Sequence, residues 1–145
     1  MSELRMDAEE REAFLAGVHV GVLAIERADG PPLAVPVWYA YEPGGPVQIT
    51  MGGSSLKTRL LRASGRASLC AQQEELPYRY ASVEGPVTIE ELGDRRDEIV
   101  EPLAIRYLGE QMGKAYVANG IASDEVLISI TPERWFTTDY GKLGS

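Results

Sequence analysis

The stretch ITMGGSSLKTRLLRASGRASLC, residues 49–70, does most to predict the fold of this chain. A strand-like run is followed by two glycines, two serines, a short helical pattern and a second strand-like run. Because Ser54 and Ser55 are both suitable N-caps, the sequence predicts a helix over residues 56–63. Connections this short are too small for the crossover helices of a parallel sheet, so they favour an antiparallel one.

Further strand-like runs lie on both sides of this stretch. The predicted strands cover residues 18–26, 33–41, 47–51, 66–72, 77–91, 126–131 and 134–140. Turn residues 42–46 predict a hairpin, and the last two strands are expected to pair around Pro132. Pro36 marks an edge, a bulge or a ligand-facing segment, and Gly85–Pro86 predicts a bend. The pattern predicts a mainly β, α+β domain: an antiparallel barrel with Greek-key-like returns.

Helical patterns interrupt the strands at two further places. Residues 7–16 predict a short helix, with Asp7 as its N-cap and acidic residues in its first turn. Residues 94–118 form a helical insertion in which Pro102 and Gly109 predict two short helices or one kinked helix.

Length and composition exclude several classes of protein. A chain of 145 residues suits one domain, residues 1–145, and its net charge of -8 argues against a nucleic-acid partner. No run approaches the roughly 18 apolar residues that span a bilayer, so no membrane partner is expected. One cysteine, Cys70, permits no internal disulfide and indicates the cytoplasm. With one cysteine and one histidine, no Cys- or His-rich metal site is expected.

The start of the predicted helix can bind an anion. Its first backbone N–H groups lack acceptors within the helix, and the glycines before it allow a ligand to approach the backbone. On a helical wheel Leu56, Leu60 and Ala63 share a face, and Lys57 lies between Leu60 and Leu61. A lysine in that position must reach solvent or meet an anion. The residues alone leave two interpretations open: a phosphate site, or an ordinary capped surface helix.

Four phrases, in this order, resemble the split β-barrel family of pyridoxamine-phosphate-oxidase-like, flavin- and deazaflavin-binding proteins. They are AVPVWYAYE (34–42), the stretch 49–70, PYRYASVEGPVTI (77–89) and RWFTTDYGK (134–142). The chain is most similar to the branch of small reductases that use the deazaflavin coenzyme F420. The resemblance implies the FMN-binding split barrel fold, and a homodimer that holds the cofactor in a groove at its interface.

The resemblance also implies a set of cofactor-binding residues. The phosphate would be held by the segment from Thr50 to Lys57, with Lys57 as its cation, and Val37 and Trp38 would flank the ring system. Arg59 would meet the extended tail of a deazaflavin. The implied set is Val37, Trp38, Thr50, Met51, Ser54, Ser55, Lys57, Arg59, Tyr78 and Tyr80, the two tyrosines reaching across the interface.

Two departures from the family pattern narrow the implied chemistry. The predicted strand 33–40 has no basic residue, and residues 134–142 contain no histidine. Both argue against pyridoxamine phosphate oxidation and favour F420 over FMN. We therefore expect an oxidoreductase that transfers a hydride from F420 to a small organic substrate.

Two other functions stay open from the sequence. One is an FMN-binding protein of the same family, and the other is a non-catalytic binder of flavin, deazaflavin or haem. For haem, His19 is the candidate ligand, although a histidine in an apolar run is more typical of a packed side chain. No residue of the sequence is identified as catalytic.

Overall fold

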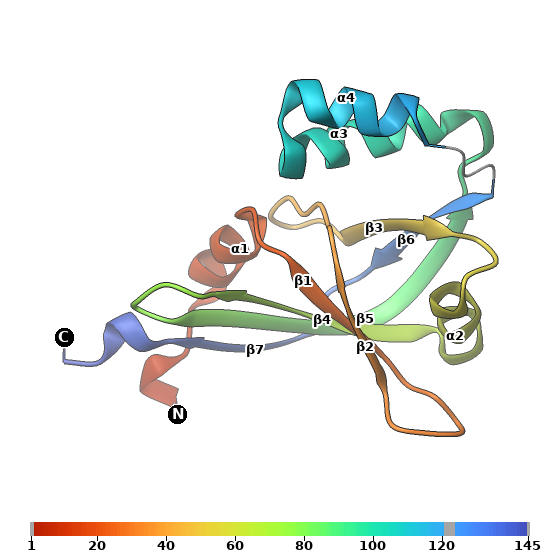
Figure 1. Ribbon diagram of the computed structural model, residues 1–145. Coiled ribbons are helices and arrows are strands. Elements are labelled where there is room, and N and C mark those ends of the chain that lie inside the picture. The colour runs from red at the N-terminus through yellow and green to blue at the C-terminus, as the bar shows by residue number, and fades with distance from the viewer. Residues whose placement is uncertain (1, 121–123, 145) are drawn as a thin grey trace.

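The computed structural model describes residues 2–120 and 124–144, and its strands form one strongly curled antiparallel sheet (Figure 1). The strands are β1 (Gly21–Ile25), β2 (Leu33–Val37), β3 (Val47–Gly52), β4 (Arg66–Gln73), β5 (Arg79–Glu91), β6 (Glu125–Ile130) and β7 (Arg134–Asp139). The helices are α1 (Ala8–Ala16), α2 (Leu56–Ser64), α3 (Arg96–Leu108) and α4 (Glu110–Ala118). Short 3-10 turns lie at Ser2–Leu4, Gly93–Arg95 and Tyr140–Lys142.

Strand β5 organises the sheet, whose strand order is β2-β1-β4-β5-β6-β3 with β7 also on β5. The first part of β5, to Pro86, pairs with β4 and β7, and its second part, from Val87, pairs with β6. At the changeover a Cβ on Gly85 would lie 1.8 Å from the carbonyl oxygen of Thr131, so only glycine fits there. The predicted bend at Gly85–Pro86 is confirmed, and it divides the sheet into the two limbs of a split barrel.

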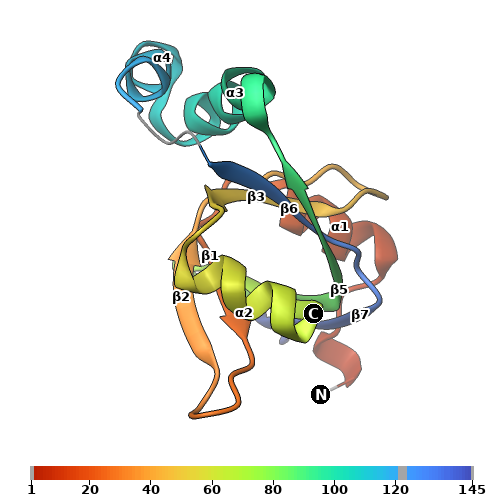
Figure 2. The ribbon, with the colours of Figure 1, turned by 90° about the vertical axis from the view of Figure 1, so that its right-hand side faces the viewer.

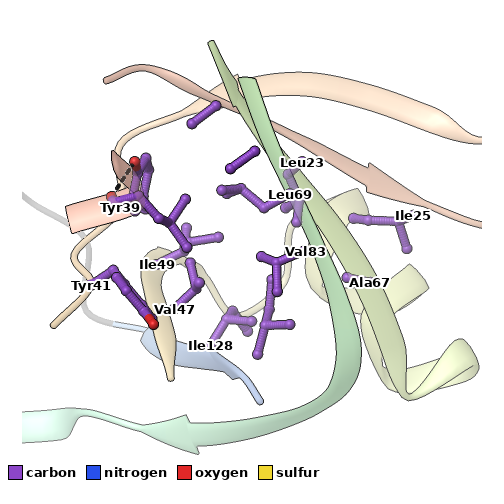
Figure 3. Close-up of a cluster of buried hydrophobic side chains, with 14 of the residues drawn as sticks. Leu23, Ile25, Tyr39, Tyr41, Val47, Ile49, Ala67, Leu69, Val83 and Ile128 are labelled. Carbon is purple, nitrogen blue, oxygen red and sulfur yellow. Dashed lines mark hydrogen bonds between the residues drawn. The ribbon is translucent and has the colours of Figure 1, made fainter. Parts of the chain in front are cut away.

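The hydrophobic core lies between the two limbs, as Figure 3 shows. Leu23, Leu69 and Val83 come from one limb, and Ile49 and Ile128 from the other, all of them fully or almost fully buried. Figure 2 shows the sheet curling around this space. The predicted antiparallel, mainly β split barrel is therefore confirmed.

Two predicted pairings are wrong. The hairpin predicted across residues 42–46 is reduced to one antiparallel bridge, from Ala40 to Gln48, whereas β3 pairs along its length with β6. Strands β6 and β7 pair with different parts of β5 instead of with each other. Both errors have one cause: the bend in β5 sends neighbouring strands to opposite limbs.

Some predicted bounds also differ from the structure. Strand β1 begins at Gly21, not at residue 18, and its outward residue Val22 is exposed, so only one of its faces is buried. Strand β2 ends at Val37, four residues earlier than predicted. An edge strand was one of the three interpretations of Pro36, and β2 lies at the edge of the sheet.

The helices follow the predicted signals closely. Asp7 caps α1 in a capping box with Glu10, and Ser55 caps α2. The insertion contains two helices, and the break between them is at Gly109, whose φ of 85° favours glycine. Pro102 lies inside α3 without ending it.

Across the described ranges 2–120 and 124–144, no helix is long and apolar enough to cross a membrane.

Candidate functional site

A groove of about 550 Å³ lies between the barrel and the α3–α4 hairpin. Figures 1 and 2 both place this hairpin over β3 and β6, on the side away from β4 and β7. Five predicted cofactor-binding residues line the groove: Val37, Trp38, Thr50, Met51 and Lys57. The end of β2, the end of β3 and the start of α2 thus bring residues 37–57 of the sequence to one place.

The β3–α2 turn forms one end of the groove. The Ser55 hydroxyl accepts a hydrogen bond from the Thr58 N–H at 3.2 Å, and the Thr58 hydroxyl donates to the Gly52 carbonyl at 2.7 Å. These bonds fix the start of α2, whose first N–H groups have no intrahelical acceptor. Lys57 lines the groove and forms no salt bridge with any residue that the structure describes.

The predicted apolar face of α2 is partly wrong. Thr58 and Leu61 are buried, whereas Leu56 is 45% exposed and Ala63 is also exposed. The buried face is therefore centred near Leu61, because Thr58 uses its hydroxyl to fasten the helix to Gly52. Lys57 lies at the border of this face, half-buried and directed to the groove.

Ser54 and Arg59 have surroundings that the sequence did not indicate. The N–H and hydroxyl of Ser54 both donate to a carboxylate oxygen of Asp124, at 3.1 and 2.9 Å. Arg59 is exposed on α2 and does not line the groove.

Two aromatic rings, those of Trp38 and Tyr116, also line the groove. The Trp38 indole is stacked on the Tyr107 ring, with centroids 5.2 Å apart and planes 6° from parallel. The Trp38 ring also contacts the Tyr116 ring of α4, with centroids 5.4 Å apart and an angle of 53° between the planes. The hydroxyl of Tyr107 donates to the His19 carbonyl at 2.6 Å, so Trp38 rests on a fixed ring.

Tyr78 and Tyr80 do not line this groove. They lie at the start of β5, with 51% and 37% of their surface exposed. Tyr80 points to the outer face of the sheet, opposite to the buried Ala81. The structure therefore separates these two residues from the other predicted site residues within one chain.

His19 is packed against α1. Its Nε2 lies 3.0 Å from the Phe14 carbonyl oxygen, and its ring is stacked on Phe14 with centroids 4.5 Å apart. Burial lowers the pKa of the His19 imidazole, and the charges of Arg106 and Arg79 lower it further. These are the surroundings of a packed, neutral histidine.

Sequence reasoning did not single out the wall that the α3–α4 hairpin and β6 supply. Its residues are Val100, Leu103, Ala104, Tyr116 and Glu125. Glu125 also forms an ion pair with Arg96 at 2.9 Å, and both side chains are only 12–13% exposed. The α3–α4 hairpin is a long insertion between β5 and β6, and no local pattern indicates which of its residues face the barrel.

A curled antiparallel sheet in two limbs, with a groove beside a capped helix start, defines the split β-barrel class of proteins. Within this class the chain belongs to the pyridoxamine 5'-phosphate oxidase family, whose family model matches residues 7–139. This is a family of flavin-binding oxidoreductases.

Solved structures share this fold. A conserved hypothetical protein of Mycobacterium tuberculosis is 25% identical with a TM-score of 0.82, and the match covers 100% of this chain and 92% of that one. An F420 reductase is 23% identical with a TM-score of 0.61, covering 86% and 94%. A FAD-binding protein of Mesorhizobium loti is 23% identical with a TM-score of 0.62, covering 91% and 94%. No curated protein sequence matches this chain significantly.

Proposed function

We propose that this protein is an F420-dependent reductase that passes a hydride to a small organic substrate. The observation that carries the proposal is that Lys57 and Trp38 line one groove. A cation and an aromatic platform in the same groove fit a cofactor with a phosphate and a planar ring.

The phosphate end has the required chemistry. Lys57 supplies a charge that no described acidic side chain neutralises, and Thr50 also lines the groove. The N–H groups of Leu56 and Lys57, in the first turn of α2, carry the partial positive charge that favours an anion. The residues present therefore fit a phosphate group at this position.

The ring end orients and shields the cofactor. Val37, Met51 and Trp38 offer apolar surface, and the α3–α4 hairpin forms one wall of the groove. A bound deazaflavin supplies the hydride chemistry itself, so the protein need only bind and orient. The groove is consistent with a role limited to binding and orientation, because the carboxylate of Glu125 that lines it is neutralised by Arg96.

We propose further that two copies of the chain form a homodimer. The outer face of β1, β4, β5 and β7 carries a row in register: Val22, Cys70, Ser82 and Phe136. Val22 and Phe136 are 42% and 53% exposed, and small side chains lie between them. An apolar, uncovered sheet face of this kind suits a second copy, whose Tyr78 and Tyr80 would then be available to the cofactor.

The experiment that tests this proposal is a fluorescence titration of the protein with oxidised F420 and, in the same buffer, with FMN. Tighter binding of F420 supports the reductase, and tighter binding of FMN moves the protein to the flavin-using part of the family. Turnover of reduced F420 with enones or quinones then separates an enzyme from a carrier. If neither cofactor binds, the proposal is wrong, and a haem titration becomes the next measurement.

A further inference from the structure

Asp124, the residue before β6, holds the β3–α2 turn in place. Its carbonyl oxygen accepts a hydrogen bond from the Gly53 N–H at 2.8 Å. Its carboxylate accepts two more from Ser54, at 3.1 Å from the N–H and 2.9 Å from the hydroxyl. A Cβ on Gly53 would lie 2.6 Å from the Asp124 carbonyl oxygen, so the glycine allows this close approach. Asp124 therefore fixes the conformation of the turn that precedes Lys57.

The same contacts place a negative charge on the turn that leads into the proposed phosphate site. No Lys or Arg within residues 2–120 and 124–144 forms an ion pair with Asp124. Its neighbour Glu125 differs in this respect, because Arg96 neutralises that carboxylate. Lys57 is the one cation that lines the described groove. Asp124 does not line the groove itself, but its carboxylate is bound to Ser54, two residues before the first residue of α2.

We infer that Asp124 makes this site select a phosphate diester over a terminal phosphate monoester. A diester carries one negative charge, whereas a monoester carries 1.5 to 2 at about pH 7. Lys57 can balance one charge, and β2 has no basic residue to balance a second. The extra charge of a monoester is then repelled by the Asp124 carboxylate.

This inference rests on the proposed function, because it assumes that the cofactor phosphate binds at the start of α2. The phosphate of F420 is a diester that continues into a tail, and that of FMN is a terminal monoester. Asp124 would thus be the specificity-determining residue between the two cofactors. It would also be a positioning residue, since its hydrogen bonds shape the turn.

Two substitutions at this position separate charge from positioning. Asp124→Asn removes the charge and keeps an oxygen that accepts from Ser54, whereas Asp124→Ala removes both. Asp29→Asn, at an exposed turn between β1 and β2, is the matched control. Dissociation constants for F420 and FMN are measured on each variant at pH 7.5.

We expect Asp124→Asn to tighten FMN binding by roughly three- to tenfold and F420 binding by less, because one repulsion of a partly screened charge is removed. Asp124→Ala should weaken both cofactors, and Asp29→Asn should change neither. If Asp124→Asn leaves the ratio of the two dissociation constants unchanged, the inference is overturned while the proposed function stands. If the wild type binds neither cofactor, both are overturned together.

The pH dependence supplies a second readout. The FMN phosphate gains its second charge near about pH 6, whereas a diester does not titrate there. The increase in affinity that Asp124→Asn produces over the wild type should therefore become larger from pH 5.5 to pH 7.5 for FMN and stay constant for F420. If the increase in FMN affinity is the same at both pH values, selection by charge is contradicted.

Discussion

The hydroxyl of Tyr107, on α3, accepts a hydrogen bond from the backbone N–H of Tyr39 at 3.0 Å. It also donates to the carbonyl oxygen of His19, at 2.6 Å. One side chain of the helical hairpin thus satisfies the backbone of two segments that flank the groove. Because the same ring supports Trp38, the attachment of the hairpin and the shape of the site depend on one residue.

Tyr107→Phe should therefore destabilise the protein while leaving the stacked ring in place. The change leaves the Tyr39 N–H and the His19 carbonyl without a partner, at a cost of about 1–3 kcal/mol in the free energy of unfolding. Urea unfolding measures this cost. Tyr116→Phe is the control, since the Tyr116 hydroxyl makes no hydrogen bond in the described ranges, and it should change stability by less than about 0.5 kcal/mol. Equal stability of the two variants would contradict this account.

Lys57→Ala should weaken F420 binding by roughly ten- to a hundredfold, since the phosphate loses its one side-chain cation. The measurement is the same fluorescence titration, at low salt. Arg62→Ala removes a charge from the exposed side of the same helix and serves as the control. A similar loss of affinity in both variants would mean that net charge, and not a specific clamp, attracts the cofactor.

Sequence reasoning identified the elements of the fold because their signals are local. Asp7, Ser55 and Gly109 begin or end helices through their own backbone and side-chain chemistry. Asp7 was predicted as a cap, and Ser55 and Gly109 were each one of two candidates. The pairing of β3 with β6 was missed, since it depends on the direction that β5 takes after its bend. Local signals therefore predict elements better than they predict partners.

The candidate site shows the same division. Residues from Val37 to Lys57 lie close in the sequence, and seven of them line one groove, including five of the predicted site residues. Asp124 and Tyr116 come from segments more than fifty residues away, and no periodicity connects Asp124 with Ser54 or Tyr116 with Trp38, the residues that they contact. Such residues become visible only when the sheet order is known.

Phe136→Lys should disrupt the proposed homodimer, because it places a charge in the apolar row on the outer sheet face. We expect a monomer by light scattering, with the far-ultraviolet circular dichroism of the wild type. Leu76→Lys is the control, since Leu76 is 77% exposed but lies outside the strands. A Phe136→Lys variant that remains a dimer would show that another surface forms the interface.

Cys70 lies in the same row and provides an independent measure of that interface. Burial raises the pKa of its thiol, so little reactive thiolate is present at neutral pH. The wild type should react slowly with a disulfide reagent, and Phe136→Lys should react several-fold faster because a partner no longer covers the row. Equal rates in the dimer and the monomer would place Cys70 outside the interface.

His19 should make the protein less stable at mildly acidic pH. Burial, with the charges of Arg106 and Arg79, lowers the pKa of its imidazole in the folded state. As the pH falls through the ordinary pKa of about 6.5, the unfolded chain binds a proton that the folded chain does not, so the free energy of unfolding decreases. Above that pKa the contribution of a neutral His19 to stability is complete.

The measurement is urea unfolding at pH 7.5 and 5.5, a range above the titration of most carboxylates. His19→Gln should show a smaller loss of stability between the two pH values than the wild type, whatever its stability at pH 7.5. Because the chain has one histidine, its imidazole NMR signal also reports the pKa without ambiguity. An imidazole that titrates at or above its ordinary value would contradict the lowered pKa, and the pH dependence would then belong to other groups.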